Sequence, residues 1–359
     1  MEPLTLRNYQ RDAMEEIQRN WVANKMRVIL SLPTGGGKTE TAIAIMSEAH
    51  SQGNRCLVIV DRLVLCDQWI KRMHHNGLTD TGKLQGKRTS RSKDAAFVVA
   101  TAQTIASRGV NQDFGLVVID ECHYWHKTHQ EVMNAIKPNV YVIGLSATPL
   151  NQKMIEFFDA VVAPVSAAEL VQTGSLVRSR IFIPNGGKQI QRALKGVAIK
   201  QGDFKSSELD KAMRGIEIMG DVVHEWLKLG ENRPTIAFCV SVKHAQALAA
   251  QFEEKGVQSF ALTQETNLDQ RQKIITDFER GKIKVLTSVN VLAVGFDSPL
   301  ASCAIFARPT LSKSLHVQMA GRVLRLFKEK NGALILDHAG NIERHGQIEN
   351  SLFHKVSTN

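Results

Sequence analysis

LPTGGGKT, at residues 32–39, is the stretch that decides the fold of this 359-residue chain. It follows an apolar run, Arg27–Leu30, which predicts a buried strand, and it precedes a run at 41–46 that predicts a helix. In this context a glycine-rich turn surrounds phosphate oxygens with backbone N–H groups at the start of the helix. Lys38 would reach the β and γ phosphates of a nucleotide, and Thr39 would bind its magnesium ion.

An ordinary glycine-rich turn is the alternative, because Leu32 stands where the strict phosphate-loop pattern has glycine. A second stretch, Leu116–Glu121, favours the phosphate loop, because it places a carboxylate pair at the end of an apolar strand. Asp120 would hold magnesium through water. Glu121 would polarise the water that attacks the γ-phosphate.

Four further stretches complete the order that a two-lobed ATP-driven motor needs. They are VDRLVLCDQW (60–69), LSATP (145–149), TSVNVLAVGFDSP (287–299) and QMAGRVLR (318–325). In the last stretch, Arg322 and Arg325 are three residues apart, so on a helix they would share a face and point at one phosphate. Guanidinium groups suit stabilisation of the charge that develops on a γ-phosphoryl group.

Together these stretches resemble the superfamily 2 helicases and translocases, whose two lobes each adopt a RecA-like fold. Several segments also resemble the bacterial RadD-type helicases and their phage-encoded relatives: LRNYQ (6–10), DECH (120–123), GFDSP (295–299) and LILDHAGN (334–341). RadD-type proteins carry a further cysteine-rich zinc module, and this chain resembles a short form without it. The resemblance implies an α/β fold of two tandem RecA-like domains, parallel sheets with helices on both faces, and an ATP site in the cleft between the domains.

The resemblance also implies roles for individual residues, with ATP and Mg²⁺ as cofactors. The implied nucleotide contacts are Arg7, Gln10, Pro33, Thr34, Gly35, Gly36, Gly37, Lys38, Thr39, Gly295 and Asp297, of which Thr39 acts on the metal together with Asp120. The implied catalytic residues are Lys38, Asp120, Glu121, Gln318, Arg322 and Arg325, and the coupling residues are His123, Ser146 and Thr148. The implied nucleic-acid contacts are Arg62, Thr101, Gln103, Thr104, Ser241, Thr287 and Asn290.

Simpler roles remain open for several of these side chains. Arg7 and Gln10 would otherwise be surface residues at a helix start, and His123 would otherwise be a core histidine bonded to a carbonyl oxygen. The hydroxyl and amide residues assigned to nucleic acid would otherwise cap helices or form turns.

Alternating strand-like and helix-like runs predict a first domain at 1–164, a linker at 165–187 and a second domain at 188–359. Expected strands of the first domain include Cys56–Val60 and Leu116–Ile119, and those of the second include Thr235–Val240 and Ala333–Asp337. A helix is expected over Lys313–Leu326. The segment between the second and third strands is expected to be a basic loop, with Lys83, Lys87, Arg88, Arg91 and Lys93.

Composition agrees with a nucleic-acid partner. Lys plus Arg number 45 against 35 for Asp plus Glu, and the net charge of +10 would attract phosphate backbones. The five cysteines have no C-x-x-C spacing, so neither a zinc ribbon nor a disulfide framework is expected. A monomer in the cytoplasm of a bacterial or phage-infected cell, without a membrane partner, is the expectation.

The sequence thus predicts an ATP-dependent helicase or translocase in DNA replication, recombination or repair, acting on single-stranded or forked DNA, with replication or recombination proteins as partners. Cys122-His123 replaces the Ala-Asp of RNA-specific DEAD-box proteins, and the segment at 60–63 lacks their Pro-Thr-Arg-Glu-Leu stretch. Two alternatives remain open, an RNA-dependent ATPase and an ATP-gated DNA clamp that does not unwind.

Overall fold

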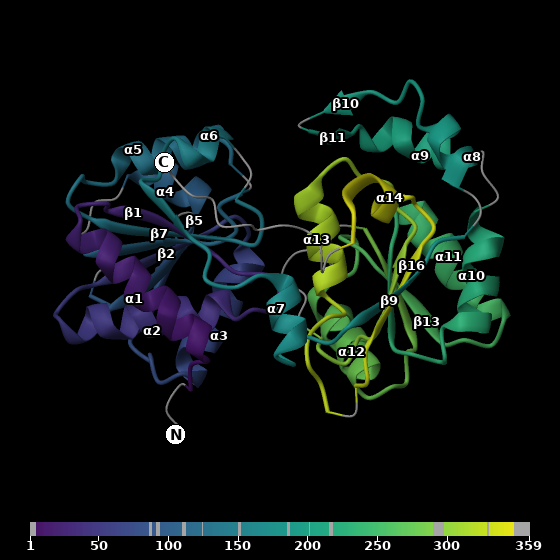
Figure 1. Ribbon diagram of the computed structural model, residues 1–359, viewed down its shortest axis with the longest axis horizontal. Helices are drawn as coiled ribbons and strands as arrows, with labels where there is room; N and C mark the ends of the chain where they lie inside the picture. Colours follow the sequence, from purple (N-terminus) through teal and green to yellow (C-terminus); the bar gives the residue numbers. More distant parts are fainter. Residues whose placement is uncertain are drawn as a thin grey trace. The chain divides into compact units, whose positions relative to one another are not determined.

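Two parallel sheets carry the described part of the chain (Figure 1). The computed structural model describes residues 5–85, 88–90, 94–109, 113–123, 125–149, 152–184, 187–200, 202–214, 218–289, 298–328 and 330–347. These residues form two compact units, which divide after Ser166. The predicted α/β class with two parallel-sheet domains is confirmed.

The first unit has an eight-stranded sheet in the order β4-β3-β5-β2-β6-β7-β1-β8. Its strands are β1 (Arg27–Ser31), β2 (Cys56–Val60), β3 (Thr81–Gln85), β4 (Arg88–Ser90), β5 (Phe97–Thr101), β6 (Leu116–Ile119), β7 (Tyr141–Ser146) and β8 (Ala160–Val162). All neighbours pair in parallel except β3 and β4. The carboxyl ends of β1, β6 and β7 therefore meet at one edge of the sheet.

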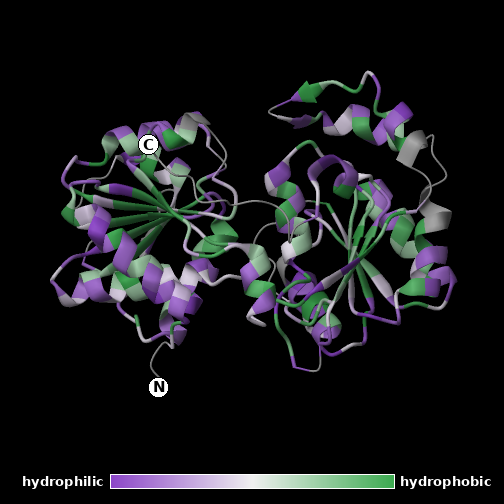
Figure 2. Cartoon of the chain, viewed as in Figure 1, coloured by the Kyte–Doolittle hydropathy of each residue, from purple (hydrophilic) through white to green (hydrophobic). Residues whose placement is uncertain are grey.

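Helices cover both faces of this sheet, with α1 to α3 on one side and α4 to α6 on the other (Figure 1). They are α1 (Asn8–Val22), α2 (Lys38–Ser51), α3 (Leu63–His75), α4 (Ala102–Arg108), α5 (Lys127–Ala135) and α6 (Gln152–Ile155). Every residue of β2 and β5 is buried, as expected for strands covered on both faces, and Figure 2 shows the sheet as a hydrophobic layer.

The second unit has a six-stranded, all-parallel sheet in the order β13-β14-β12-β15-β16-β9. Its strands are β9 (Ser179–Phe182), β12 (Thr235–Phe238), β13 (Ser259–Leu262), β14 (Val285–Ser288), β15 (Cys303–Phe306) and β16 (Ala333–Asp337). The long helices α10 (Ile218–Leu229) and α11 (Val242–Glu254) lie on one side of this sheet, and α12 (Leu268–Glu279) and α13 (Lys313–Gly321) lie on the other (Figure 1).

Shorter elements complete the second unit. These are α7 (Ala167–Gln172), α8 (Gly187–Ala193), α9 (Ser206–Arg214), α14 (Asn341–His345) and the antiparallel hairpin of β10 (Ile199–Lys200) and β11 (Asp203–Phe204). The hairpin, α8 and α9 lie together beyond one end of the sheet (Figure 1). Asp203 attaches the hairpin to the rest of the unit, because its carboxylate accepts hydrogen bonds from the Leu311 backbone N–H and the Thr310 hydroxyl at 2.7 and 2.8 Å.

Three segments differ from the expectation. The range 165–187, expected as a linker, contains α7 and the strand β9, which pairs with β16. The basic segment after β2 contains β3 and β4, and Lys83 forms an ion pair with Asp67 at 2.7 Å. Lys87, Arg91 and Lys93 lie outside the described residues.

The helix expected over Lys313–Leu326 ends at Gly321. Arg322 is the residue that caps it, and two residues later the Leu324 carbonyl oxygen accepts a hydrogen bond from the Val177 backbone N–H at 2.9 Å. The expectation that Arg322 and Arg325 share one face of a helix is therefore wrong. None of the described helices is long and apolar enough to cross a lipid bilayer.

Candidate nucleotide-binding site

The predicted phosphate loop connects the end of β1 to the start of α2. Gly37 stands immediately before α2 with φ +81°, a left-handed conformation that glycine adopts readily. A Cβ atom on Gly37 would also lie 2.4 Å from Nε2 of Gln10, so the position requires glycine for space as well. The loop therefore has the backbone shape that a phosphate cradle before a helix needs.

Lys38, the first residue of α2, folds back over this loop. Its ammonium group donates a hydrogen bond to the carbonyl oxygen of Leu32 at 3.0 Å. Its charge also opposes the rise that burial causes in the pKa of Asp120 and adds to the fall that burial causes in the pKa of His123, and both of these residues follow β6. Thr39 lies one residue further along the same helix turn and is half-buried.

Asp120 and Glu121 follow β6 directly. The two carboxylate oxygens of Asp120 each accept a hydrogen bond, Oδ1 from the Glu121 backbone N–H at 2.9 Å and Oδ2 from the Trp69 indole N–H at 2.8 Å. Burial and the nearby Glu121 carboxylate raise the pKa of Asp120 to about 6. Glu121 itself has φ +47°, a left-handed conformation that is uncommon outside glycine and recurs at functional sites.

The coupling residues lie next to this carboxylate pair. Nδ1 of His123 is 3.3 Å from Oε2 of Glu121 and 3.3 Å from the Ser146 hydroxyl oxygen. The Ser146 hydroxyl in turn accepts a hydrogen bond from the Thr148 backbone N–H at 2.9 Å. Burial, followed by the charge of Lys38, lowers the pKa of His123 to about 4, so its imidazole is neutral near pH 7. His123 is 8% exposed, and these contacts join it to two functional segments.

The end of β7 joins the phosphate loop to the carboxylate segment. β7 lies between β6 and β1 in the sheet. The Leu32 backbone N–H donates to the Ser146 carbonyl oxygen at 3.2 Å, and the Cys122 backbone N–H donates to the Leu145 carbonyl oxygen at 2.9 Å. A displacement of any one of the three segments would therefore change the positions of the other two.

Helix α1 is attached to the phosphate loop by Gln10. Its Nε2 donates to the Gly37 carbonyl oxygen and to the Thr41 hydroxyl, both at 3.1 Å, and its Oε1 accepts from the Arg7 backbone N–H at 2.9 Å. The Tyr9 hydroxyl donates to the Gly36 carbonyl oxygen at 3.0 Å. Gln10 is 5% exposed, so it is not the surface residue that the simpler interpretation describes. Tyr9 lay within the quoted LRNYQ motif but received no role from the sequence.

These residues fit a magnesium nucleotide. Mg²⁺ usually binds one or two carboxylates and the phosphates of its substrate, and does not need a cage of protein ligands. Thr39 and Asp120 supply such oxygen donors, and the described residues contain no cluster of three or more His, Cys, Asp or Glu side chains that forms another metal site. Lys38 supplies the positive charge that phosphate requires.

In the second unit, the predicted catalytic residues lie around the end of α13. Gln318 and Arg322 are almost fully buried, at 3% and 7% exposure, and Arg325 is half-buried after the helix has ended. Gly295 and Asp297 lie outside the described residues.

Three predicted nucleic-acid contacts are buried in the structure. The hydroxyl groups of Thr101 and Thr104 hydrogen-bond each other at 2.8 Å, and Thr101 caps the start of α4. Thr287 is fully buried and donates to the Ala245 carbonyl oxygen at 2.7 Å. These side chains stabilise the fold as caps and packing contacts, because backbone groups at helix ends and in the core need partners.

The other predicted contacts lie closer to the surface. Arg62 and Gln103 are exposed at the starts of α3 and α4, after two parallel strands. Ser241 is half-buried and caps α11 by accepting a hydrogen bond from the His244 backbone N–H at 3.2 Å. Asn290 lies outside the described residues.

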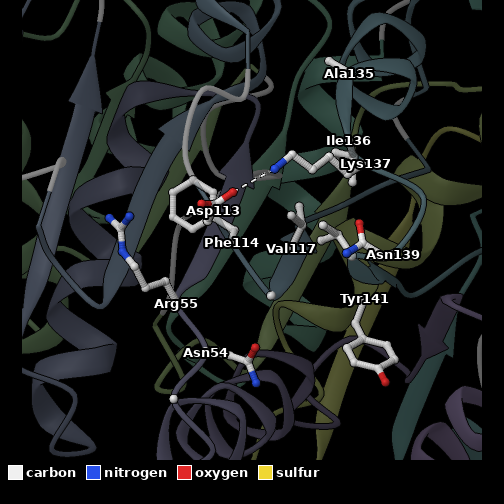
Figure 3. Close-up of a pocket in the computed structure, with 13 residues that line it drawn as sticks. Asn54, Arg55, Asp113, Phe114, Val117, Ala135, Ile136, Lys137, Asn139 and Tyr141 are labelled. Carbon is white, nitrogen blue, oxygen red and sulfur yellow. Dashed lines mark hydrogen bonds and ion pairs between the residues drawn. The ribbon is translucent and has the colours of Figure 1, made fainter.

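A separate pocket of about 550 Å³ lies at the opposite edge of the first sheet, before β2, β6 and β7 (Figure 3). Arg55, Phe114 and Tyr141 line it, and the guanidinium group of Arg55 lies 5.1 Å from the centre of the Phe114 ring. Lys137 and Asp113 form an ion pair at its rim at 2.8 Å. The sequence did not predict this pocket, since Val117, within the strand before the carboxylate pair, is its only lining residue that belongs to a quoted stretch.

Comparisons with known proteins agree with both units. Residues 3–151 match the family model described as "Type III restriction enzyme, res subunit", and residues 217–327 match that of the "Helicase conserved C-terminal domain". A 51.5 kDa protein of a Lactococcus phage is 27% identical over 322 residues, which cover 89% of this chain and 67% of the phage protein.

A Saccharomyces cerevisiae protein named for an ATP-dependent helicase, IRC3, is 27% identical over 360 residues, covering 93% of this chain and 51% of the yeast protein. The chain thus spans about half the length of the yeast relative and two thirds that of the phage relative. The solved fragment of an HsdR subunit of a type I restriction enzyme from Vibrio vulnificus YJ016 shares the fold, with a TM-score of 0.70, 20% identity, and coverage of 96% of this chain and 66% of that fragment. These two domain matches, one in each unit, support an assignment to the superfamily 2 helicases, a family of ATP-hydrolysing helicases and translocases.

Proposed function

We propose that this chain hydrolyses ATP with Mg²⁺ and uses the cycle to move along DNA. One observation carries the proposal: the phosphate loop, the Asp120–Glu121 segment and Ser146 lie at the carboxyl ends of three neighbouring parallel strands and are joined there by backbone hydrogen bonds. Phosphoryl transfer depends on positioning and on stabilisation of charge, and these segments supply both.

Each residue of the first unit has a role in this proposal. The backbone of the phosphate loop and Lys38 bind the phosphates, and Thr39 and Asp120 would hold Mg²⁺. When bound, the metal ion would neutralise charge on the β and γ phosphates. Glu121 orients and polarises the attacking water, since general-base help of this kind contributes about 10²–10⁴-fold to rate. Arg7 and Gln10 are proposed to contact the adenine base.

The second unit contributes the remaining groups. Gln318, Arg322 and Arg325 are proposed to stabilise the charge that develops on the γ-phosphoryl group, with Gly295 and Asp297 contacting the nucleotide. His123, Ser146 and Thr148 are proposed to transmit the state of the γ-phosphate, because His123 lies within 3.3 Å of both Glu121 and Ser146.

Arg62 and Gln103 are the strongest candidates for contacts with the nucleic-acid backbone, because both are exposed where strands of one sheet end. Ser241 and Asn290 are proposed to act from the second unit. We favour DNA because the first domain matches a restriction-enzyme family, and restriction enzymes act on DNA. The LRNYQ and LILDHAGN segments further suggest the RadD-type branch, acting as a monomer on single-stranded or forked DNA in replication, recombination or repair.

Steady-state ATP hydrolysis tests the proposal, measured without nucleic acid and with single-stranded DNA, duplex DNA, forked DNA or RNA. We expect DNA to stimulate hydrolysis, and we expect Lys38→Ala and Glu121→Gln to abolish the stimulated rate. Lys137→Ala is the matched control, because it removes an equivalent charge at the opposite edge of the same sheet. Hydrolysis that survives Lys38→Ala would contradict the proposed site.

The choice of effector separates the remaining alternatives. Stimulation by RNA well above that by DNA would indicate an RNA-dependent ATPase. ATP-dependent DNA binding without displacement of a triplex-forming strand would indicate a clamp that does not move.

A further inference from the structure

We propose that Trp69 is a positioning residue for the metal-binding carboxylate of Asp120. This inference rests on the proposed nucleotide site. Trp69 lies on α3, which follows β2, whereas Asp120 follows the neighbouring strand β6. The indole N–H donates to Oδ2 of Asp120 at 2.8 Å, across 51 residues of sequence.

The sequence explains why the indole reaches this carboxylate. Leu65, Cys66, Trp69 and Met73 are the buried residues of α3, so a helical repeat of three to four residues turns Trp69 toward the sheet. Because β2 and β6 pair in parallel, the helix that follows one strand and the carboxylate that follows the other lie at the same edge. Trp69 is 3% exposed, so water does not compete readily for its N–H.

The second hydrogen bond on Asp120 makes the geometry specific. Oδ1 accepts from the backbone N–H of Glu121, and Oδ2 accepts from Trp69, so the plane of the carboxylate is fixed by a donor at each oxygen. A carboxylate has about four acceptor positions, so each oxygen retains capacity for a metal-bound water. Removal of a partner that orients a metal ligand in this way typically lowers metal affinity by about 10–100-fold.

Trp69→Phe tests the role, because it removes the N–H and keeps an aromatic ring in the same space. The chain offers a matched control in Trp226, which is also 3% exposed and whose indole N–H donates to the Thr235 hydroxyl at 2.7 Å in the other unit. Trp226→Phe therefore deletes the same chemical group from an equally buried site with no carboxylate.

The measured quantity is metal affinity. Mn²⁺, used as a paramagnetic substitute for Mg²⁺, is titrated into the full chain saturated with a non-hydrolysable ATP analogue, and free Mn²⁺ is followed by electron paramagnetic resonance. Affinity for the analogue in EDTA is measured separately. For Trp69→Phe we expect Mn²⁺ affinity to fall at least about tenfold and analogue affinity in EDTA to change less than about twofold. For Trp226→Phe we expect neither to change.

Two results would overturn the inference: Mn²⁺ affinity within twofold of the unsubstituted chain, or equal losses of analogue affinity with and without metal. Asp120→Asn gives a further check, because Trp69→Phe in that background should cause no additional loss of Mn²⁺ affinity.

A measurement on the unsubstituted chain covers the case in which Trp69→Phe does not fold. With ¹⁵N-labelled tryptophan, the Trp69 indole signal is assigned by elimination from the Phe variants of the other three tryptophans. We expect this signal to shift when Mg²⁺ is added to the analogue complex, and an unmoved signal would also overturn the inference. If the unsubstituted chain binds no analogue, the proposed function itself fails. If it binds analogue and Mn²⁺ but Trp69→Phe behaves as Trp226→Phe does, only the role of Trp69 fails.

Discussion

The side-chain amide of Gln10 donates a hydrogen bond to the carbonyl oxygen of Gly37 at 3.1 Å, and so attaches the first helix to the phosphate loop. The same amide also bonds Thr41, and its carbonyl oxygen accepts from Arg7. The shape of the loop thus depends on a side chain 27 residues earlier in the chain.

Gln10→Ala should weaken nucleotide binding and the fold together. The change removes three hydrogen bonds, each of which contributes about 0.5–1.5 kcal/mol. We expect about tenfold weaker binding of a fluorescent ATP analogue and a lower urea midpoint. Gln18→Ala is the control on the same helix, because its amide bonds Glu48 at the exposed surface. Equal effects of both substitutions would contradict the link to the loop.

Gly37→Ala should destabilise the loop through two separable effects. A left-handed conformation costs a non-glycine residue about 1–2 kcal/mol, and the new Cβ would also meet Nε2 of Gln10 at 2.4 Å. Gly53→Ala isolates the first effect, because Gly53 has φ +87° with no atom within 4 Å of an added Cβ. Thermal unfolding should show a larger loss for Gly37→Ala, and Gln10→Ala in the same chain should remove the excess. Similar losses at Gly37 and Gly53 would show that the contact with Gln10 is unimportant.

Glu121→Gln should slow hydrolysis by about 10²–10⁴-fold while nucleotide binding is retained, because the amide keeps the size of the side chain but cannot act as a base. Single-turnover hydrolysis and analogue titration measure the two quantities. Glu131→Gln on α5, at an exposed pair with Lys127, serves as the control. A parallel loss of binding and hydrolysis would place Glu121 in the binding of the nucleotide instead.

His316 should make the second unit sensitive to acid. Burial is the main cause that lowers its pKa from 6.5 to about 4, and the His345 ring stacks on it with 5.1 Å between centroids. Between these values the unfolded chain binds a proton that the folded chain does not, so stability is lost as pH falls from 6.5 toward 4. A shift of one pKa unit corresponds to 1.36 kcal/mol, so the free energy of unfolding should fall by about 2 kcal/mol between pH 7 and pH 5.

His316→Gln removes this contribution, so its free energy of unfolding should depend less on pH over that range, whatever the substitution costs at pH 7. Urea unfolding at pH 7 and pH 5 provides the comparison. Exposed His224→Gln on α10 should leave the pH dependence as it is. An unchanged pH dependence in His316→Gln would assign the acid sensitivity to other groups.

Asp203→Ala should release the hairpin of β10 and β11. Asp203 accepts from Thr310 and Leu311 and lies 3.5 Å from the guanidinium group of Arg308. Hydrogen bonds to a charged group contribute about 1.5–3 kcal/mol, so we expect faster limited proteolysis within 187–214 and a lower unfolding midpoint. Asp113→Ala, at an exposed pair with Lys137 in the first unit, should affect proteolysis far less. Resistance equal to that of the unsubstituted chain would mean that other contacts hold the hairpin.

The sequence alone determined the parallel sheets and the positions of the loop, the carboxylate pair and Ser146. It did so because strands buried on both faces are continuous apolar runs, which β2 and β6 show, and because functional groups follow the carboxyl ends of such strands. Strand β9 escaped prediction, since Ser179–Phe182 is half-exposed and short, and only pairing with β16 makes it a strand.

Tertiary structure alone decided which polar side chains serve the site and which serve the fold. Thr101 and Thr287 carry hydroxyl groups suited to contacts with a nucleic-acid backbone. Their side chains are nevertheless buried and hydrogen-bonded within their own units. Tryptophan is a common core residue, yet the indole N–H of Trp69 donates a hydrogen bond to Asp120, the proposed metal-binding carboxylate. Local sequence specifies a side chain's chemistry and its helical face, but its partner is set by the order of strands in the sheet, which brings together residues far apart in the chain.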